Sequence, residues 1–329
     1  METIASGKWV AYAGVAALLA AGVGRPAAGA ADAHVPLLRD TGFRQGVTVY
    51  DPAPGRHVAR GALRADPNTP PPRWGLAQWH SRFTLAAARA EPTAAGVRFA
   101  DGSKSVAFTR GGLVLAIDSG REYGGRPRRK GQPWPHLLVE QKIADCPPLT
   151  RLDGLRFRIE CRLLRAKAHE PGRHDRRLHA AQFQAFVTVQ DRRRGSPGRG
   201  DYLWFGVPIY DSRWRIPRGH AAQDFAGTGK FIHTPAGSAF TEQSAHDGNW
   251  VRIDADVLPM IRRALRTARE RGYLKRSPDD AAFQLGSFNL GWEMPGAFDA
   301  AMAVRGLALV AGVRGPATRA AIPPRRGGR

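Results

Sequence analysis

Two glutamates, Glu140 and Glu293, lie in stretches where apolar and polar residues alternate. Successive side chains of a β-strand point to opposite faces, so residues of the same parity share a surface. Glu140 has the parity opposite to Leu137 and Val139, and Glu293 has the parity opposite to Trp292. We therefore expect both carboxylates to leave the core and face one groove. Two carboxylates at one site can work as a general acid and as a nucleophile or base.

The segment 202–210 carries aromatic residues where a solvent-facing strand would carry Thr, Lys or Glu. Its odd-numbered residues predict an apolar core face made of Leu203, Phe205, Val207 and Ile209. The other face holds Tyr202, Trp204 and Tyr210. The apolar face of a sugar ring stacks on such rings, and a Tyr hydroxyl can bond sugar hydroxyls. This face is therefore expected to bind sugar, unless another layer covers it and the rings only pack.

Neighbouring stretches add hydrogen-bonding groups with the same outward parity. We expect them to complete a substrate-binding surface consisting of Trp134, His136, Gln182, Gln184 and Asn289, with Asp211 and Arg213 just beyond Tyr210. Planar aromatic rings combined with polar groups are typical of ligand grooves. By contrast, residues 155–163 place Arg and Glu outside an apolar stripe, as an ordinary solvated strand does. The pattern indicates a concave groove that binds a polysaccharide.

The reaction, if there is one, depends on which groups flank the sugar linkage. A hydrolase needs two carboxylates at the scissile bond, and we expect Glu140 and Glu293, with Asp211 in reserve. In a lyase, His136 or Tyr210 would abstract the C5 proton while Gln184 or Arg213 neutralised a uronate. A structural role for the two glutamates, bonding Arg or backbone at a strand end, is the alternative.

Short apolar runs separated by Gly, Pro, Asp and Arg must position these groups. They lie at 106–108, 113–118, 137–143, 155–163, 182–190, 202–210, 250–255, 283–292 and 298–309. Many short runs of this kind predict an all-β sandwich or barrel. One surface helix is expected at about 257–271, with Asp256 as its cap and Pro259 in its first turn. Its apolar stripe consists of Leu258, Ile261, Leu265 and Ala268.

The C-terminal part carries a family resemblance. A strand ends near Asp254, the expected helix follows, and Leu290-Gly-Trp-Glu-Met-Pro-Gly-Ala-Phe298 leads into a last strand. Residues 76–312 resemble the concanavalin-type jelly-roll superfamily of glucanases, lectins and alginate-lyase-like enzymes. The resemblance implies a jelly-roll β-sandwich and an acid/base role for Glu293. It also implies a nucleophilic carboxylate in the segment 202–205, where this chain reads Tyr-Leu-Trp-Phe. This departure favours a binding protein over a retaining hydrolase.

The chain divides into four expected parts. Residues 1–30 resemble a signal peptide, with Lys8, an apolar run from 9 to 23 and the small-residue pattern Ala28-Gly29-Ala30. A retained anchor is the alternative. Residues 31–75 are expected to be a loop-rich extension, 76–312 the β-sandwich, and 313–329 a basic disordered tail. We therefore expect a secreted or periplasmic monomer without a membrane span after cleavage.

Cysteine content and charge limit the partners. The chain contains 2 cysteines, Cys146 and Cys161, which in an oxidising compartment are expected to form one disulfide. No C-x-x-C or His/Cys cluster indicates a metal, and we expect no cofactor. The net charge is +22, mostly from Arg, in an Ala-, Gly- and Pro-rich composition that codon bias also produces. We expect no nucleic-acid partner, because export and the missing recognition motifs oppose one. An anionic polysaccharide remains open.

Two functions remain nearly level. The first is a secreted carbohydrate-active enzyme, hydrolase or lyase, with its site in the groove. The second is a non-catalytic glycan-binding or cell-envelope protein of the same fold. A scaffold that binds no sugar would leave the aromatic face without a purpose.

Overall fold

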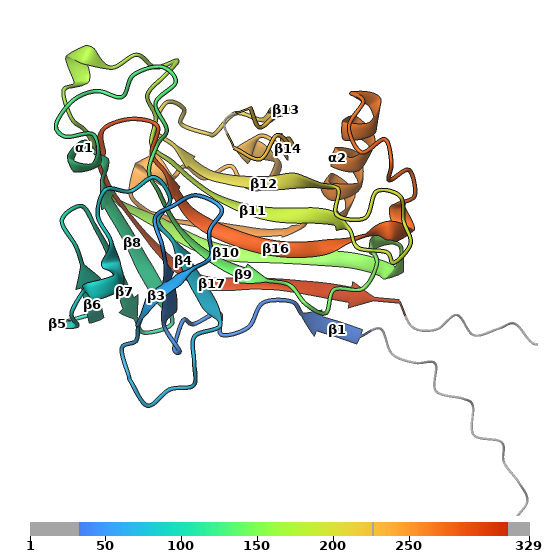
Figure 1. Cartoon of the computed structure of the whole chain (residues 1–329), viewed down its shortest axis with the longest axis horizontal. Helices are drawn as coiled ribbons and strands as arrows, with labels where there is room; N and C mark the ends of the chain where they lie inside the picture. Colours follow the sequence, from blue (N-terminus) through green and yellow to red (C-terminus); the bar gives the residue numbers. More distant parts are fainter. Residues whose placement is uncertain (1–32, 226, 315–329) are drawn as a thin grey trace, which may run out of the picture.

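The computed structural model describes residues 33–225 and 227–314. They form two large, mainly antiparallel sheets packed face to face (Figure 1). Sheet A has the order β15-β10-β17-β8-β7-β6-β5, with β1 beside β17, and sheet B has the order β13-β14-β12-β11-β16-β9-β4-β2-β3. The predicted all-β sandwich is thus confirmed.

The chain passes several times between the sheets, and in places several consecutive strands belong to the same sheet. Sheet A contains β1 (Ala33–Pro36), β5 (Glu91–Thr93), β6 (Gly96–Ala100), β7 (Lys104–Thr109), β8 (Gly112–Asp118), β10 (Leu152–Ala168), β15 (Trp250–Asp256) and β17 (Phe298–Val313). Sheet B contains β2 (Val47–Tyr50), β3 (Ala59–Leu63), β4 (Trp74–Ala77), β9 (His136–Lys142), β11 (Gln182–Asp191), β12 (Tyr202–Asp211), β13 (His220–Gln223), β14 (Phe231–Thr234) and β16 (Phe283–Glu293). Every apolar run identified in the sequence lies on one of these strands.

Helices are few. The α-helices are α1 (Ser119–Glu122) and α2 (Leu258–Glu270), and short 3-10 turns are η1 (Leu85–Ala87), η2 (Leu149–Arg151), η3 (Pro171–Arg173), η4 (Gly237–Ala239), η5 (Ala245–Asp247) and η6 (Asp280–Ala282). The predicted surface helix is α2. Its apolar stripe is buried, and Pro259 fits the first turn. The predicted cap differs, because the N-cap residue is Val257 and has no side-chain cap; Asp256 lies one residue earlier, where its Oδ1 accepts the Leu258 N–H at 3.0 Å.

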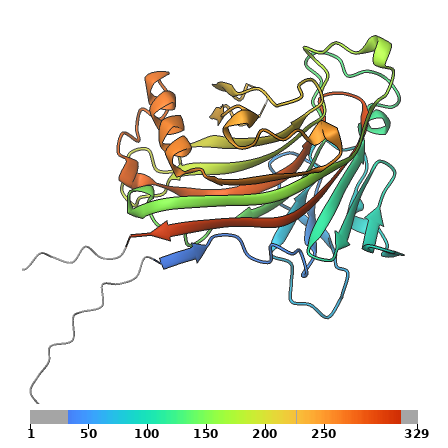
Figure 2. The ribbon, with the colours of Figure 1, turned by 180° about the vertical axis from the view of Figure 1, so that it is seen from behind.

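The core lies between the sheets. On β10 the side chains of Leu155, Phe157, Ile159 and Cys161 are at most 1% exposed, and the residues between them face outward. The alternation expected for this strand is confirmed. Seen from behind in Figure 2, the long strands of the two sheets run alongside one another, and α2 stands at one end of the sandwich. This helix contacts β10, β12 and β14.

The N-terminal boundary of the sandwich lies earlier than predicted. Residues 31–75 were expected to form an extension, yet β1 pairs with β17, and β2 and β3 extend sheet B. The short Val47-Thr-Val-Tyr50 alternation is a genuine strand signal that the Pro-rich stretch after it obscured. The expected signal peptide (1–30) and most of the expected tail (315–329) lie outside the described residues. Among the described residues, no helix is both long and apolar enough to cross a membrane.

The predicted disulfide is wrong, because Cys146 and Cys161 are both free and buried. Cys146 lies in the turn after β9, whereas β10 begins at Leu152 and extends for nine residues to Cys161. That stretch of β10 is roughly 30 Å long at about 3.3 Å per residue. A disulfide requires Cα atoms about 4–7 Å apart. The two thiols therefore serve as small apolar core groups.

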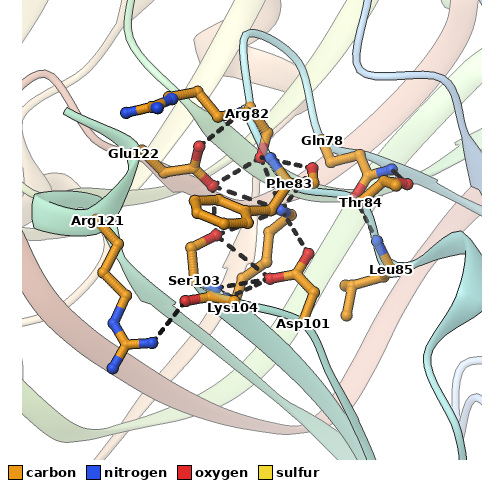
Figure 3. A network of polar contacts seen from close by, with 12 residues as sticks. Gln78, Arg82, Phe83, Thr84, Leu85, Asp101, Ser103, Lys104, Arg121 and Glu122 are labelled. Carbon is orange, nitrogen blue, oxygen red and sulfur yellow. Dashed lines mark hydrogen bonds and ion pairs between the residues drawn. The ribbon is translucent and has the colours of Figure 1, made fainter. Parts of the chain in front are cut away.

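A buried charged network fixes the segment 78–85, which leads from β4 to η1 (Figure 3). The Lys104 side chain is 0% exposed, and its Nζ lies 2.7 Å from Asp101 Oδ2 and 3.5 Å from Glu122 Oε1. It also donates to the Phe83 carbonyl at 2.9 Å. The Glu122 carboxylate accepts the Arg82 N–H at 2.6 Å. The network thus ties β7 and α1 to the segment that carries Trp79.

Candidate functional site

The outer face of sheet B carries a groove of about 1340 Å³. Its floor is formed by β9, β16 and β11, and its walls include Tyr202 and Trp204 on one side and the segment 50–57 on the other. We call this surface the sheet B groove. Among its lining residues are Tyr50, His57, Gly75, Trp79, Glu140, Lys142, Thr188, Gln190, Tyr202, Trp204, Thr228 and Asn289.

Glu140 occupies the floor of the groove on β9. Its Oε1 lies 2.7 Å from His57 Nε2, and its side chain is 16% exposed against 50% for His57. Burial raises the pKa of the Glu140 carboxyl, and the charges of His57 and Lys142 oppose this rise. A carboxylate and an imidazole therefore meet at the open surface of the groove.

Aromatic rings lie around this His57–Glu140 contact. The Tyr50 and Trp79 rings both lie edge-on to His57, at 5.1 Å and 6.4 Å between centroids. Gly75 makes room for Tyr50, because a Cβ at this position would come within 2.2 Å of its ring. The glycine in β4, the strand next to β9, therefore allows the Tyr50 ring to take this position.

Asn289 is the register partner of Glu140 on the adjacent strand β16. It is 7% exposed and lines the groove, and its Oδ1 has no hydrogen-bond partner among the described residues. Trp79 Nε1 is likewise buried and unpaired within the part of the chain that the structure describes. Leaving such an atom unpaired costs about 1–3 kcal/mol, so a ligand in the groove that pairs with both atoms gains that stabilisation.

Glu293 stands at the end of β16. Its side chain is 20% exposed, and its Oε2 lies 3.9 Å from His136 Nε2. Burial raises the pKa of Glu293 to about 7, although the adjacent Trp134 and Gln184 side chains favour the charged form. Burial also lowers the pKa of His136 to about 4. At neutral pH this end of the site thus holds a carboxyl that still carries its proton part of the time, next to an uncharged imidazole.

A second carboxylate approaches Glu293 from the segment between β13 and β14. Asp224 adds to the raised pKa of Glu293 and partly offsets the lowered pKa of His136. Asp224 Oδ2 accepts from the Thr228 N–H at 2.7 Å and from the Thr228 hydroxyl at 2.8 Å. Thr228 Oγ1 in turn accepts the Trp204 indole N–H at 3.1 Å. Asp224 is therefore attached to the aromatic wall of the groove.

The strand register separates the two predicted catalytic glutamates. Glu293 pairs with His136, and Glu140 lies four residues farther along β9. At about 3.3 Å per residue the separation along the strand is about 13 Å. Glycosidase carboxyl groups that flank one bond lie only about 5–9.5 Å apart. Both glutamates lie on the outer face of sheet B, but only Glu140 is among the residues that line the groove, and the geometry does not support their facing each other across one linkage.

The aromatic wall follows the predicted parity in its first half. The Tyr202 and Trp204 rings meet edge to face at 5.6 Å, and Trp204 meets Phe186 at 6.0 Å. Both Tyr202 and Trp204 line the groove. Lys230 Nζ lies over the Tyr202 ring at 5.2 Å from its centroid.

The prediction for Tyr210 is wrong. The pairing of β11 with β12 shifts register between Phe183 and Gln184, which face Tyr210 and Pro208 respectively. This bulge turns Tyr210 into the core, where it is 4% exposed and packs 5.9 Å from Trp292. Burial raises the pKa of Tyr210 above its ordinary value of 10.0. The phenol therefore keeps its proton at neutral pH, which argues against a role as base.

Gln182, Asp211 and Arg213 lie together at the Glu293 end of sheet B. Gln182 pairs with Glu293 on one side and with Asp211 on the other. Arg213 binds the Asp211 carboxylate through its Nε at 2.9 Å and its Nη2 at 2.6 Å, and Gln182 Nε2 donates to the same group at 3.0 Å. Because Arg213 is engaged in this way, it is not free to neutralise a uronate.

The sequence did not predict four residues of the candidate site, Tyr50, His57, Trp79 and Asp224. Three of them lie outside long alternating runs, in turns whose position only the fold determines. Tyr50 ends the Val47–Tyr50 alternation, which was the only available signal. Within the described residues, no group of three or more His, Cys, Asp or Glu side chains could hold a metal ion.

Comparisons with known proteins give distant likenesses only. No family model matches the chain, and neither does any curated protein. Among solved structures, endoglucanase Cel12A from Rhodothermus marinus is 9% identical, with a TM-score of 0.40 over 73% of this chain and 99% of that one. A family 12 xyloglucanase from Bacillus licheniformis is 6% identical, with a TM-score of 0.41 over 68% and 100% of the two chains.

A family 11 xylanase from Neocallimastix patriciarum is 8% identical, with a TM-score of 0.36 over 65% of this chain and 90% of that one. These similarities are too low to carry a functional argument. The description of this chain as a β-sandwich rests on its own two sheets.

Proposed function

We propose that this protein binds a polysaccharide in the sheet B groove. The observation that carries the proposal is a long groove that combines aromatic rings with buried, unpaired polar atoms. Tyr50, Trp79, Tyr202 and Trp204 offer ring surfaces to sugar C–H groups. Asn289 Oδ1 and Trp79 Nε1 are an acceptor and a donor for sugar hydroxyls. A chain of sugars can offer C–H faces to the aromatic rings and hydroxyl groups to the unpaired polar atoms along the length of the groove.

We further propose that the bound glycan is hydrolysed with Glu293 as general acid. A general acid must hold its proton near the working pH, and burial raises the pKa of Glu293 to about 7. Hydrolysis also requires a second carboxylate. Asp224 is our choice, because its charge acts on Glu293 and its hydrogen bonds to Thr228 hold it beside the aromatic wall. Glu140 then serves binding rather than bond cleavage.

A non-catalytic glycan-binding or envelope protein is the second candidate. It is favoured by the absence of any carboxylate in residues 202–205 and by the strand register that separates Glu140 from Glu293. Export from the cytoplasm, expected from residues 1–30, is compatible with both candidates and is part of this proposal.

One experiment separates the candidates. The purified protein is incubated with neutral and uronic polysaccharides while reducing ends and the absorbance of unsaturated uronate are followed. We expect new reducing ends without unsaturated product, and a loss of at least about 100-fold in kcat for Glu293→Gln. Glu160→Gln, on the outer face of sheet A, is the matched control. Binding without either product would leave only the binding function.

A further inference from the structure

Three side chains from separate segments meet on the open floor of the sheet B groove. Glu140 comes from β9, Asn289 from the paired position on β16, and His57 from the segment between β2 and β3. The His57–Glu140 contact of 2.7 Å fixes two of them, and strand pairing fixes the third. They lie about 13 Å along the strand direction from the Glu293 end of the site.

Two hydrogen-bond acceptors of this cluster are open to a ligand. Glu140 uses Oε1 for His57, while an ionised carboxylate has a second oxygen that also only accepts. Asn289 Oδ1 is buried and accepts nothing from the described residues. A ligand at this place must therefore bring O–H or N–H donors.

The walls suit a flat ring. Tyr50 packs over Gly75, and Trp79 lies 6.4 Å from His57 between ring centroids, with its buried Nε1 unpaired in the described structure. The segment 78–85 that carries Trp79 is fixed by the Lys104 network. The cluster is thus preorganised, which lowers the entropic cost of binding.

We propose that Glu140, His57 and Asn289 form a sugar subsite that accepts hydrogen bonds from the hydroxyl groups of one neutral ring. This inference rests on the proposed polysaccharide-binding function and narrows its ligand. A uronate carboxylate brings only acceptors, so at this subsite it would face the Glu140 carboxylate and Asn289 Oδ1 without a proton to share. The overall charge of +22 draws anionic polymers to the surface, but the subsite selects hydroxyl donors.

The test is calorimetric titration of the purified protein with neutral oligosaccharides (cello-, xylo- and manno-oligomers) and with oligogalacturonate and oligomannuronate. We expect a neutral oligomer to bind and the uronates not to displace it. Glu140→Gln and Asn289→Leu should each weaken binding about tenfold, the loss of about one hydrogen bond to a buried group. A Glu140→Gln/Asn289→Asp double variant keeps the acceptor oxygen at 289 without two facing carboxylates, and should bind within about threefold of Glu140→Gln alone, which a need for the Asn289 amide donor would not allow.

Glu160→Gln on sheet A is the matched control, and thermal unfolding of every variant checks its fold. Displacement by uronates, or unchanged binding in both Glu140→Gln and Asn289→Leu, would overturn the subsite while leaving polysaccharide binding intact. If no oligomer of either class binds, the proposed function itself fails.

Discussion

Glu293 is a carboxyl group whose ionisation the fold opposes. Its raised pKa arises first from burial between β9 and β11, then from the charge of Asp224, against the stabilising contacts of Trp134 and Gln184. A group of this kind links protonation to folding. With a folded pKa of about 7 and an ordinary value of 4.5, the folded chain holds a proton that the unfolded chain releases between these two values.

Glu293→Gln should therefore change how stability depends on pH. The stabilisation from the protonated form is complete below pH 4.5 and is lost as the pH rises to 7. The total loss in the free energy of unfolding is at most about 3 kcal/mol. Urea unfolding at pH 4 and pH 8 measures this loss. We expect the variant to lose less stability than the unaltered protein between these pH values. An identical loss in both would show that Glu293 has an ordinary pKa.

Gly75→Ala tests whether the backbone of β4 shapes the groove. The added Cβ would lie 2.2 Å from a Tyr50 ring atom, so the ring must move. Overpacking of this kind costs about 1–3 kcal/mol, and the displaced ring should also weaken glycan binding. Unfolding and titration measure the two effects. Gly42→Ala is the control, because its new Cβ would approach nothing closer than 3.9 Å.

Residue parity alone predicted the face of the sheet for many of the candidate site residues. It failed where the hydrogen-bonding register of two strands is irregular. Glu140, Glu293, Gln184, Trp204 and Tyr202 lie on the face that alternation predicts. Tyr210 does not, because a register shift within one pair of strands reverses every side chain beyond it. No sequence period marks a bulge of this kind. His57 and Asp224 were missed because turn residues acquire their neighbours only through the tertiary fold.

The elements themselves were easier to predict than their partners. Long apolar runs and the amphipathic helix are local signals, and they correspond to β7–β12, β15–β17 and α2. Pairing is not local: β16 lies between β11 and β9, far from both in sequence. The short strands β1, β2 and β3 gain their stability from the edges of sheets they join, so their sequences carry little signal of their own.

At the scale of secondary-structure elements, the buried Lys104 network holds the segment 78–85 in place, and a single substitution can break it. Lys104→Met removes the cation from Asp101 and Glu122, two carboxylates with at most 9% side-chain exposure. Breaking a buried ion pair on one side costs about 3–5 kcal/mol, since the remaining charges are uncompensated. Urea unfolding at pH 7 measures the loss, and adding Glu122→Gln should recover part of it.

Arg98→Ala provides the comparison for Lys104→Met. Arg98 and Glu91 form an ion pair of 2.7 Å whose side chains are 44% and 54% exposed. Exposed pairs contribute about 0–1 kcal/mol, so the stability of this variant should barely change. Equal effects at Arg98 and Lys104 would contradict the view that the network fixes the segment carrying Trp79.

For the whole molecule, the two sheets bury enough apolar surface to fold without a covalent link. Cys146 and Cys161 belong to one continuous core cluster, and both are at most 5% exposed. Burial raises the pKa of each thiol, and a thiol reacts chiefly as its thiolate. The fold thus protects two cysteines that composition and expected export suggested were paired.

Thiol counting with a chromogenic disulfide reagent tests this arrangement in the whole chain. We expect no rapid reaction in buffer at pH 8 and two reactive thiols per chain in about 6 M guanidinium chloride, without any reductant. A reducing agent should leave the unfolding midpoint unchanged, because there is no loop-closing bond to remove. Absence of thiols in the unfolded chain, or a midpoint that falls on reduction, would mean that Cys161 is bonded to Cys146 and that β10 does not hold the two thiols apart.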